Sequence, residues 1–66
     1  MTPSQIRAAR LKTGLTQEQA AGICWVAMRT FQDWERGIAK APEAAIRVFL
    51  HRTGQGEIPV DHSIYP

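Results

Sequence analysis

The stretch that decides the fold runs from Thr16 to Gly37 and reads TQEQAAGICWVAMRTFQDWERG. It begins with a capping box, in which the side chains of Thr16 and Gln19 can each accept a hydrogen bond from an otherwise unpaired amide at a helix start. Because this pairing marks a helix terminus, the pattern predicts a helix from Gln17 to about Ile23.

The spacing of apolar residues later in the same stretch indicates a second helix. Val26, Phe31 and Trp34 fall on one face at helical spacing, and Gly37 is a favourable left-handed helix end. The pattern predicts a helix over residues 27–36. No glycine or proline stands between the two helices, so the break between them is inferred from the wider pattern.

Helix signals also lie on both sides of this pair. Thr2 followed by Pro3 predicts a helix start, and Thr13 followed by a glycine predicts the end of that helix. Pro42 stands at the expected first position of a fourth helix, which Gly54 closes. The chain is therefore expected to be an all-α domain of four helices. Its expected core comprises Ile6, Leu15, Ala21, Phe31, Trp34, Ile46 and Phe49.

The last twelve residues have a different composition. Residues 55–66 contain two prolines and scattered apolar side chains, so they cannot form a helix of useful length. We therefore expect one compact helix-turn-helix domain over residues 1–54, followed by an irregular or strand-like C-terminal tail.

Length and composition narrow the class of protein. The 66 residues allow one small domain, and the 44% hydrophobic and 21% charged residues are typical of a folded domain. The longest apolar run has six residues, too few to cross a bilayer, and the single cysteine excludes an internal disulfide. We expect a cytoplasmic protein without a membrane partner.

Charge is distributed unevenly along the chain. Residues 1–56 carry eight Lys and Arg against four Asp and Glu, a net charge of +4, whereas the whole chain carries +2. A basic body favours a polyanionic partner, although many solvated domains have a similar charge. No paired carboxylates, Ser/His/Asp set, phosphate-binding glycine loop or clustered metal ligands are present, so the sequence predicts neither an enzyme nor a cofactor, metal or small-molecule site.

Several residue groups stand at a characteristic spacing along the chain. They are Ile6, Arg7, Arg10, Gly14, Leu15, Thr16, Gln17, Ala21, Val26, Phe31, Trp34, Glu35 and Gly37. These groups resemble the phage-repressor and Cro type of helix-turn-helix protein, often called the Xre or lambda-repressor-like family, over roughly residues 3–53. The resemblance implies a homodimer that binds an inverted repeat in double-stranded DNA, with helix 27–36 in the major groove.

The outward residues near the start of helix 27–36 are the candidates for contacts with base edges. Arg29 can donate two hydrogen bonds to guanine, and Gln32 can pair with adenine. Asp33 can accept from cytosine, and Met28 can pack on a thymine methyl group. The alternative is that this polar face only meets water, as most exposed helix faces do.

A second group of residues is expected to position the protein on the DNA backbone. Gln17 stands at the positive end of its helix, where the resemblance implies a hydrogen bond to phosphate. The expected phosphate contacts are Thr16, Gln17, Thr30, Arg36 and Lys40. Arg10 and Glu35 are instead expected to form a partly buried ion pair that holds two helices together.

The sequence departs from the family pattern in three places. Trp25 stands where a glycine with positive φ is usual. We expect the turn to be rebuilt around it; the alternative is that the indole is held exposed in a strained conformation because it contacts a partner chain or the DNA backbone. Ala27 replaces the usual Ser or Thr cap. The fifth helix used by many relatives for dimerisation is missing, and we expect tail residues to pack against helix four of a second subunit instead. The expected dimer contacts are Ile58, Val60, Ile64 and Tyr65.

The function implied is that of a transcriptional regulator, a repressor of phage or mobile-element type. The alternative is an antitoxin-like or adaptor module that uses the same fold to bind a protein. Salt-sensitive binding to duplex DNA would separate the two.

Overall fold

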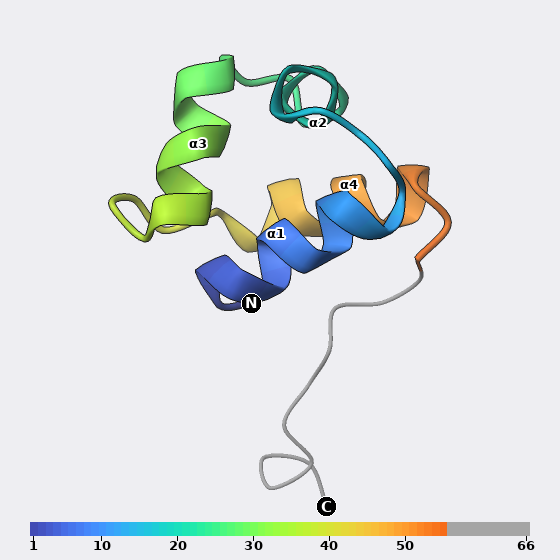
Figure 1. The fold of residues 1–66 in the computed structure, drawn as a ribbon, viewed down its shortest axis with the longest axis horizontal. Helices are drawn as coiled ribbons and strands as arrows, with labels where there is room; N and C mark the ends of the chain where they lie inside the picture. The colour runs from blue at the N-terminus through green and yellow to red at the C-terminus, as the bar shows by residue number, and fades with distance from the viewer. Residues whose placement is uncertain (56–66) are drawn as a thin grey trace, which may run out of the picture.

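The computed structural model describes residues 1–55, and this part of the chain is a compact all-α domain (Figure 1). Its elements are the helices α1 (Pro3–Lys12), α2 (Gln17–Ile23), α3 (Met28–Arg36) and α4 (Glu43–Arg52). The prediction of four helices is confirmed, and no strand occurs among the described residues. The strand-like tail and its four expected dimer contacts, Ile58, Val60, Ile64 and Tyr65, lie outside them.

The starts of α1 and α2 follow the predicted capping chemistry. The Thr2 hydroxyl accepts from the Gln5 amide at 3.1 Å, and the Gln5 side chain accepts from the Thr2 amide at 2.8 Å. Thr16 and Gln19 form the same reciprocal pair at 3.1 and 2.9 Å. Gly14 then turns the chain between the two helices with φ of +73°. Each start therefore has two of its orphan amides satisfied locally.

The starts of α3 and α4 differ from prediction by one residue each. Helix α3 begins at Met28, and Ala27 is its N-cap in an extended conformation, without a side-chain hydrogen bond. Pro42 is the N-cap of α4 rather than its first helical residue, and Glu43 opens the helix. In both cases the residue before the helix has extended backbone angles, so its carbonyl accepts the first helical bond without being helical itself.

The core forms where α1 and α4 meet the pair α2 and α3. Helix α3 packs against α1 and α2, and α2 also packs against α4 (Figure 1). The Phe31 ring lies 5.6 Å from that of Trp34 and 5.9 Å from that of Phe49 between ring centroids, in tilted pairs that favour aromatic packing. The expected core is buried except for Leu15, which is partly buried against it. The buried residues are Ile6, Ala9, Ala20, Ala21, Cys24, Phe31, Trp34, Ile46, Phe49 and Leu50.

The turn between α2 and α3 overturns one expectation. Trp25 keeps the positive φ of a glycine, at 60°, and it is the one non-glycine residue of the described chain that does so. Its side chain is 81% exposed. Hydrogen bonds on both sides hold the turn, from the Trp25 amide to the Gly22 carbonyl and from the Val26 amide to the Ala21 carbonyl. The turn is therefore not rebuilt, and the left-handed conformation costs about 1–2 kcal/mol.

The C-terminal end of the described chain is tied back to α1. Gly54, with φ of +73°, reverses the chain after α4, and the Gln55 amide donates to the Leu50 carbonyl at 2.9 Å. The Gln55 side chain donates to the Ala9 carbonyl at 3.0 Å. Within residues 1–55, no helix is long and apolar enough to cross a membrane.

Candidate nucleic-acid interface

Arg10 and Glu35 join α1 to α3 through a nearly buried ion pair. The Arg10 Nε lies 2.6 Å from Glu35 Oε2, and its Nη2 lies 3.2 Å from Oε1. The side chains are 12% and 5% exposed. Arg10 also donates to the Leu15 carbonyl at 3.0 Å, so it fixes the loop that leads into α2. The pair is a structural link between three segments rather than a surface contact.

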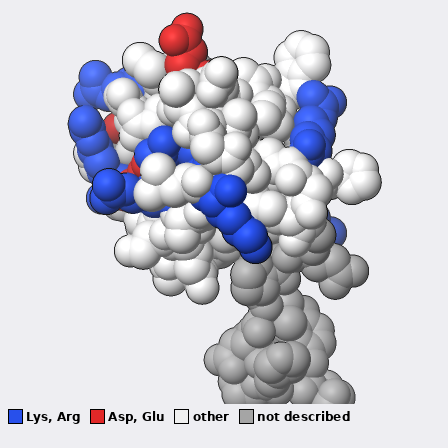
Figure 2. Space-filling view, turned by 45° about the vertical axis from the view of Figure 1, so that its right-hand side comes forward, with Lys and Arg blue, Asp and Glu red and all other residues white. Residues whose placement is uncertain are grey.

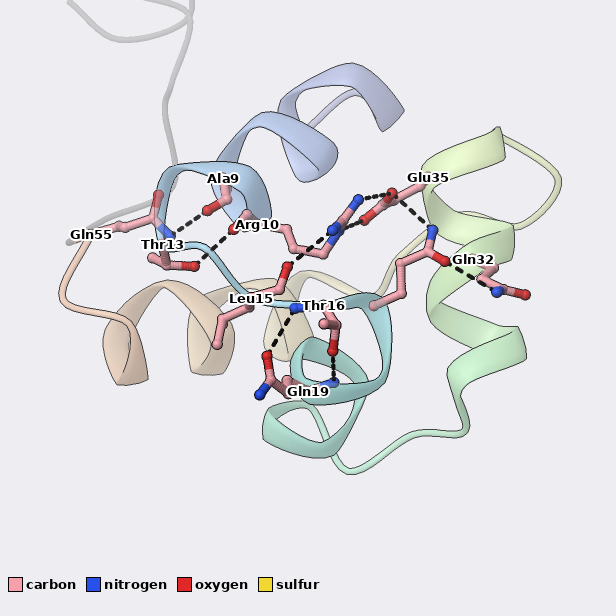
Figure 3. Close-up of polar contacts among 10 residues, drawn as sticks. Ala9, Arg10, Thr13, Leu15, Thr16, Gln19, Gln32, Glu35 and Gln55 are labelled. Carbon is pink, nitrogen blue, oxygen red and sulfur yellow. Dashed lines mark hydrogen bonds and ion pairs between the residues drawn. The ribbon is translucent and has the colours of Figure 1, made fainter.

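Gln17 and Gln32 continue this hydrogen-bond chain toward the surface (Figure 3). The Gln17 amide nitrogen donates to Glu35 Oε1 at 3.2 Å, and the Gln17 oxygen accepts from Gln32 Nε2 at 3.1 Å. Gln17 comes from the start of α2 and Gln32 from the middle of α3. The structure thus brings together Gln17, which is expected to bind phosphate, and Gln32, which is expected to read a base. The buried carboxylate of Glu35 holds Gln17, and Gln17 in turn holds Gln32.

The outward face of α3 begins at Met28, one helical turn before Gln32. Met28 is 45% exposed, and the Arg29 side chain is 79% exposed. Arg29 Nε lies 3.5 Å from Asp33 Oδ1 one helical turn later, so the two side chains run along the same face. Asp33 is more enclosed, at 23% exposure, and its Oδ1 has no hydrogen-bond partner among the described residues. Arg29 and Met28 are therefore the most accessible of the four expected base-reading residues.

A cleft of about 520 Å³ lies where the start of α2 meets α1 and the end of α3. Arg7 and Arg36 stand on its walls, and within residues 1–55 neither forms an ion pair. The positive end of α2 opens into the same space. The residues that line it are Arg7, Arg10, Thr16, Gln17, Glu35 and Arg36. Because Glu35 already pairs with Arg10, the cleft carries net positive charge.

The loop after α3 carries the remaining expected backbone contacts. Gly37, with φ of +78°, ends α3, and the Asp33 carbonyl accepts from the amides of Ile38 and Ala39. A side chain at Gly37 would bring its Cβ within 3.4 Å of Pro3 Cγ, so the loop lies close to the start of α1. Lys40 is exposed in this loop, and Thr30 is half-buried on α3.

Several basic side chains gather on one side of the domain, although others lie elsewhere. Figure 2 shows several Lys and Arg side chains together at the left of the viewed face, with acidic atoms between them, and further basic side chains at its centre and right. Arg7 is the functional candidate that sequence reasoning did not select. Its signal is visible in the spacing, since Arg7 and Arg10 lie one helical turn apart on α1 and Arg10 is anchored at the cleft.

The described residues bring no three potential metal ligands together. Comparison of the chain with models of known protein families, with curated proteins and with solved structures gave no match.

Proposed function

We propose that this protein is a sequence-specific DNA-binding transcriptional regulator of the phage-repressor and Cro type, which acts in the cytoplasm as a homodimer on an inverted repeat. One observation supports this most strongly: the exposed polar face of α3 adjoins a cleft with net positive charge at the start of α2. An exposed polar face on one helix beside a basic cleft is the arrangement that a helix-turn-helix protein needs.

In this proposal α3 enters the major groove and reads base edges. Arg29 has the exposure and the two-pronged donor geometry for guanine, and Met28 can pack on a thymine methyl group. Gln32 keeps one amide hydrogen and its oxygen for adenine while Gln17 holds its other hydrogen. Asp33 accepts from cytosine where the groove allows its carboxylate to approach.

The phosphates on either side of the groove are contacted by the cleft and the loop. Arg7 and Arg36 supply charge from two walls of the cleft, and Lys40 extends this charge along the loop. Thr16, Gln17 and Thr30 supply hydrogen bonds that position the protein. Because these contacts carry no sequence information, their loss should weaken binding to all sequences alike.

The test is a selection of bound sequences from random duplexes, followed by two matched arginine substitutions. Arg29→Ala should cost about 1–3 kcal/mol on the best site and relax base preference at one position. Arg36→Ala should weaken all sites similarly and leave the preference intact. Unchanged preference after Arg29→Ala would remove Arg29 from the reading face.

Salt dependence provides an independent measure of the backbone contacts. If four to six phosphates are neutralised per dimer, the logarithm of affinity should fall with the logarithm of salt concentration with a slope of about −4 to −5. Arg36→Ala should make this slope less negative, by about one unit for each neutralised phosphate that is lost. A slope near zero, or no binding to any duplex, would refute the proposed function and favour the adaptor reading, which the exposed Trp25 side chain supports.

A further inference from the structure

Trp25 is not among the residues proposed above to contact DNA, although its placement is unusual. Its backbone is strained, at φ of 60°, and the residue is 81% exposed. A glycine would adopt the same turn without strain, and burial in the core does not explain the side chain. A large aromatic side chain held outward in a strained turn is typical of a binding surface.

The neighbours of Trp25 come from α4. The guanidinium carbon of Arg52 lies 5.9 Å from the centroid of the indole, within cation–π distance. Val48 precedes Arg52 by one helical turn and is 39% exposed. Together Trp25, Val48 and Arg52 form what we call the Trp25 surface. His51 is exposed next to Arg52 in the last turn of α4, whereas the charge of Arg47 is balanced by its ion pair with Glu43. The surface is therefore apolar with one basic end at Arg52.

A surface of this kind fits a segment that is both apolar and acidic, and the chain itself contains one. Residues 57–65 include Glu57 and Asp61, which complement the basic end at Arg52. The same stretch holds the four apolar side chains expected to form the dimer. Eleven residues follow Gln55, and an extended segment of this length reaches about 36 Å.

We propose that residues 57–65 of a second copy of this chain dock on the Trp25 surface, in a reciprocal exchange between two copies. Gln55 is bound to the Ala9 carbonyl, so the chain leaves the fold beside α1. The Trp25 surface lies instead where α4 meets the α2–α3 turn. A two-fold exchange covers both indoles and both apolar segments at once. The inference rests on the proposed function only in that it supplies the homodimer.

Tryptophan fluorescence of the full chain tests this contact without DNA. Trp34 is 3% exposed and Trp25 is 81% exposed against residues 1–55, so quenching by acrylamide reports chiefly on Trp25. A Trp25→Phe variant assigns the two contributions. We expect Trp25 to become shielded as protein concentration rises, over the same range in which sedimentation detects dimers.

Two variants of the segment and the surface should break the contact while the fold stays intact by circular dichroism. Ile64→Ser combined with Tyr65→Ser, and separately Trp25→Gly, should each raise the dimer dissociation constant by about thirtyfold, the effect of losing a hot-spot aromatic side chain. Arg52→Glu should weaken the dimer, and mixing it with a Glu57→Arg, Asp61→Arg chain should restore association in the mixed pair.

Three outcomes would overturn the proposal: Trp25 freely quenched at every concentration, shielding that is independent of concentration and so arises within one chain, or dimerisation unaffected by the two serine substitutions. Failure of the proposed function is distinguishable, because it would abolish DNA binding while leaving shielding and dimerisation in place. Conversely, a monomeric variant that still prefers one base at the Arg29 position would retain the function without this interface.

Discussion

At the scale of single residues, the molecule contains one position where local preference and observed conformation disagree. Trp25 occupies the left-handed region, at φ of 60°, and exposes the largest side chain type there. The Arg52 guanidinium offsets part of this strain through a cation–π contact of about 0.5–1 kcal/mol at an exposed site. Because the strain exceeds this gain, the isolated fold does not benefit from a tryptophan at this turn.

Replacing Trp25 with glycine should therefore leave the monomer at least as stable. Trp25→Gly removes about 1–2 kcal/mol of backbone strain and loses the cation–π contact, so the free energy of unfolding should be unchanged or rise by up to about 1 kcal/mol. Trp25→Val, which is β-branched at the same φ, serves as the control and should be less stable than Trp25→Gly. Urea unfolding at monomeric concentrations measures both, and marked destabilisation by glycine would mean that the indole supports the fold.

Among residues 1–55, Cys24 is the one whose pKa clearly departs from its ordinary value. Its side chain is buried, with Sγ 3.9 Å from the Ala45 carbonyl oxygen, and desolvation raises the pKa of the thiol above its ordinary value. The neutral thiol is therefore favoured by folding. Its contribution to stability is complete below the thiol pKa of the unfolded chain, about 8.5, and is lost as pH rises through the folded pKa.

The expected result is a fall in unfolding free energy above about pH 8.5 that is smaller in Cys24→Ala. Alanine does not ionise, so the difference between the two proteins isolates the thiol from the other groups that titrate at alkaline pH. Urea unfolding across this pH range measures it. Parallel pH profiles for both proteins would indicate that Cys24 is solvated in the folded state.

At the scale of elements, the four helices have unequal starts. Helices α1 and α2 each carry a complete capping box, whereas the Ala27 N-cap of α3 contributes no side-chain hydrogen bond. The nine residues of α3 are held chiefly by tertiary contacts, through the buried rings of Phe31 and Trp34. Pro42 at the start of α4 also makes no side-chain cap hydrogen bond, so the helix proposed to read DNA is one of two that begin without such a cap.

Ala27→Ser should restore the missing cap. A serine hydroxyl at this extended N-cap can accept from the Thr30 amide, which should stabilise the protein by about 1 kcal/mol and raise Tm by about 4–8 °C. The matched control is Ala8→Ser in the exposed interior of α1, where serine lowers helix propensity and Tm should fall slightly. Equal effects of the two substitutions would argue against a capping role at position 27.

At the scale of the whole molecule, one buried carboxylate connects three helices. Glu35 on α3 binds Arg10 on α1 and Gln17 on α2. Removing Arg10 strands a charge that is 5% exposed, which typically costs about 3–5 kcal/mol. A domain of this size has little stability beyond that amount.

Arg10→Met should therefore largely unfold the protein, and adding Glu35→Leu should recover most of the loss, because an apolar pair of similar size replaces the ion pair. The double variant also removes the partner of Gln17, so it should fold yet bind its DNA site more weakly. Circular dichroism and DNA titration separate these effects. Full DNA affinity in the folded double variant would show that Glu35 does not orient Gln17 for binding.

The local signals in the sequence predicted most of the fold, and the errors lie at a helix start and in a turn. The starts at Thr2 and Thr16 were predictable because capping chemistry involves residues three positions apart. Pro42 was misplaced by one position because proline is compatible with both the N-cap and the first helical residue. At Trp25 a rebuilt turn was expected ahead of the strained alternative, which the structure shows, since hydrogen bonds from the surrounding turn override the preference of the residue.

The sequence predicted most residues of the candidate site but not the hydrogen bonds that join them. The spacing on α3 placed Arg29 and Gln32 on one outward face, because helical periodicity alone decides this. The bond between Gln17 and Gln32 joins residues fifteen positions apart and depends on how α2 crosses α3. Arg7 was missed for the same reason, since it lines the same cleft as Arg36 only in the folded domain.

The hydrogen bond between Gln17 and Gln32 also has an evolutionary consequence. Because Glu35 sets Gln17, and Gln17 sets the amide of Gln32, the rotational freedom of the side chain proposed to read a base is lost when the domain folds. Under the proposed function, a change in α1 that shifts the Arg10–Glu35 pair without breaking it would therefore alter which operators are preferred, although α1 carries none of the residues proposed to read bases. New DNA preferences would then arise from drift in the scaffold as well as from substitution on α3.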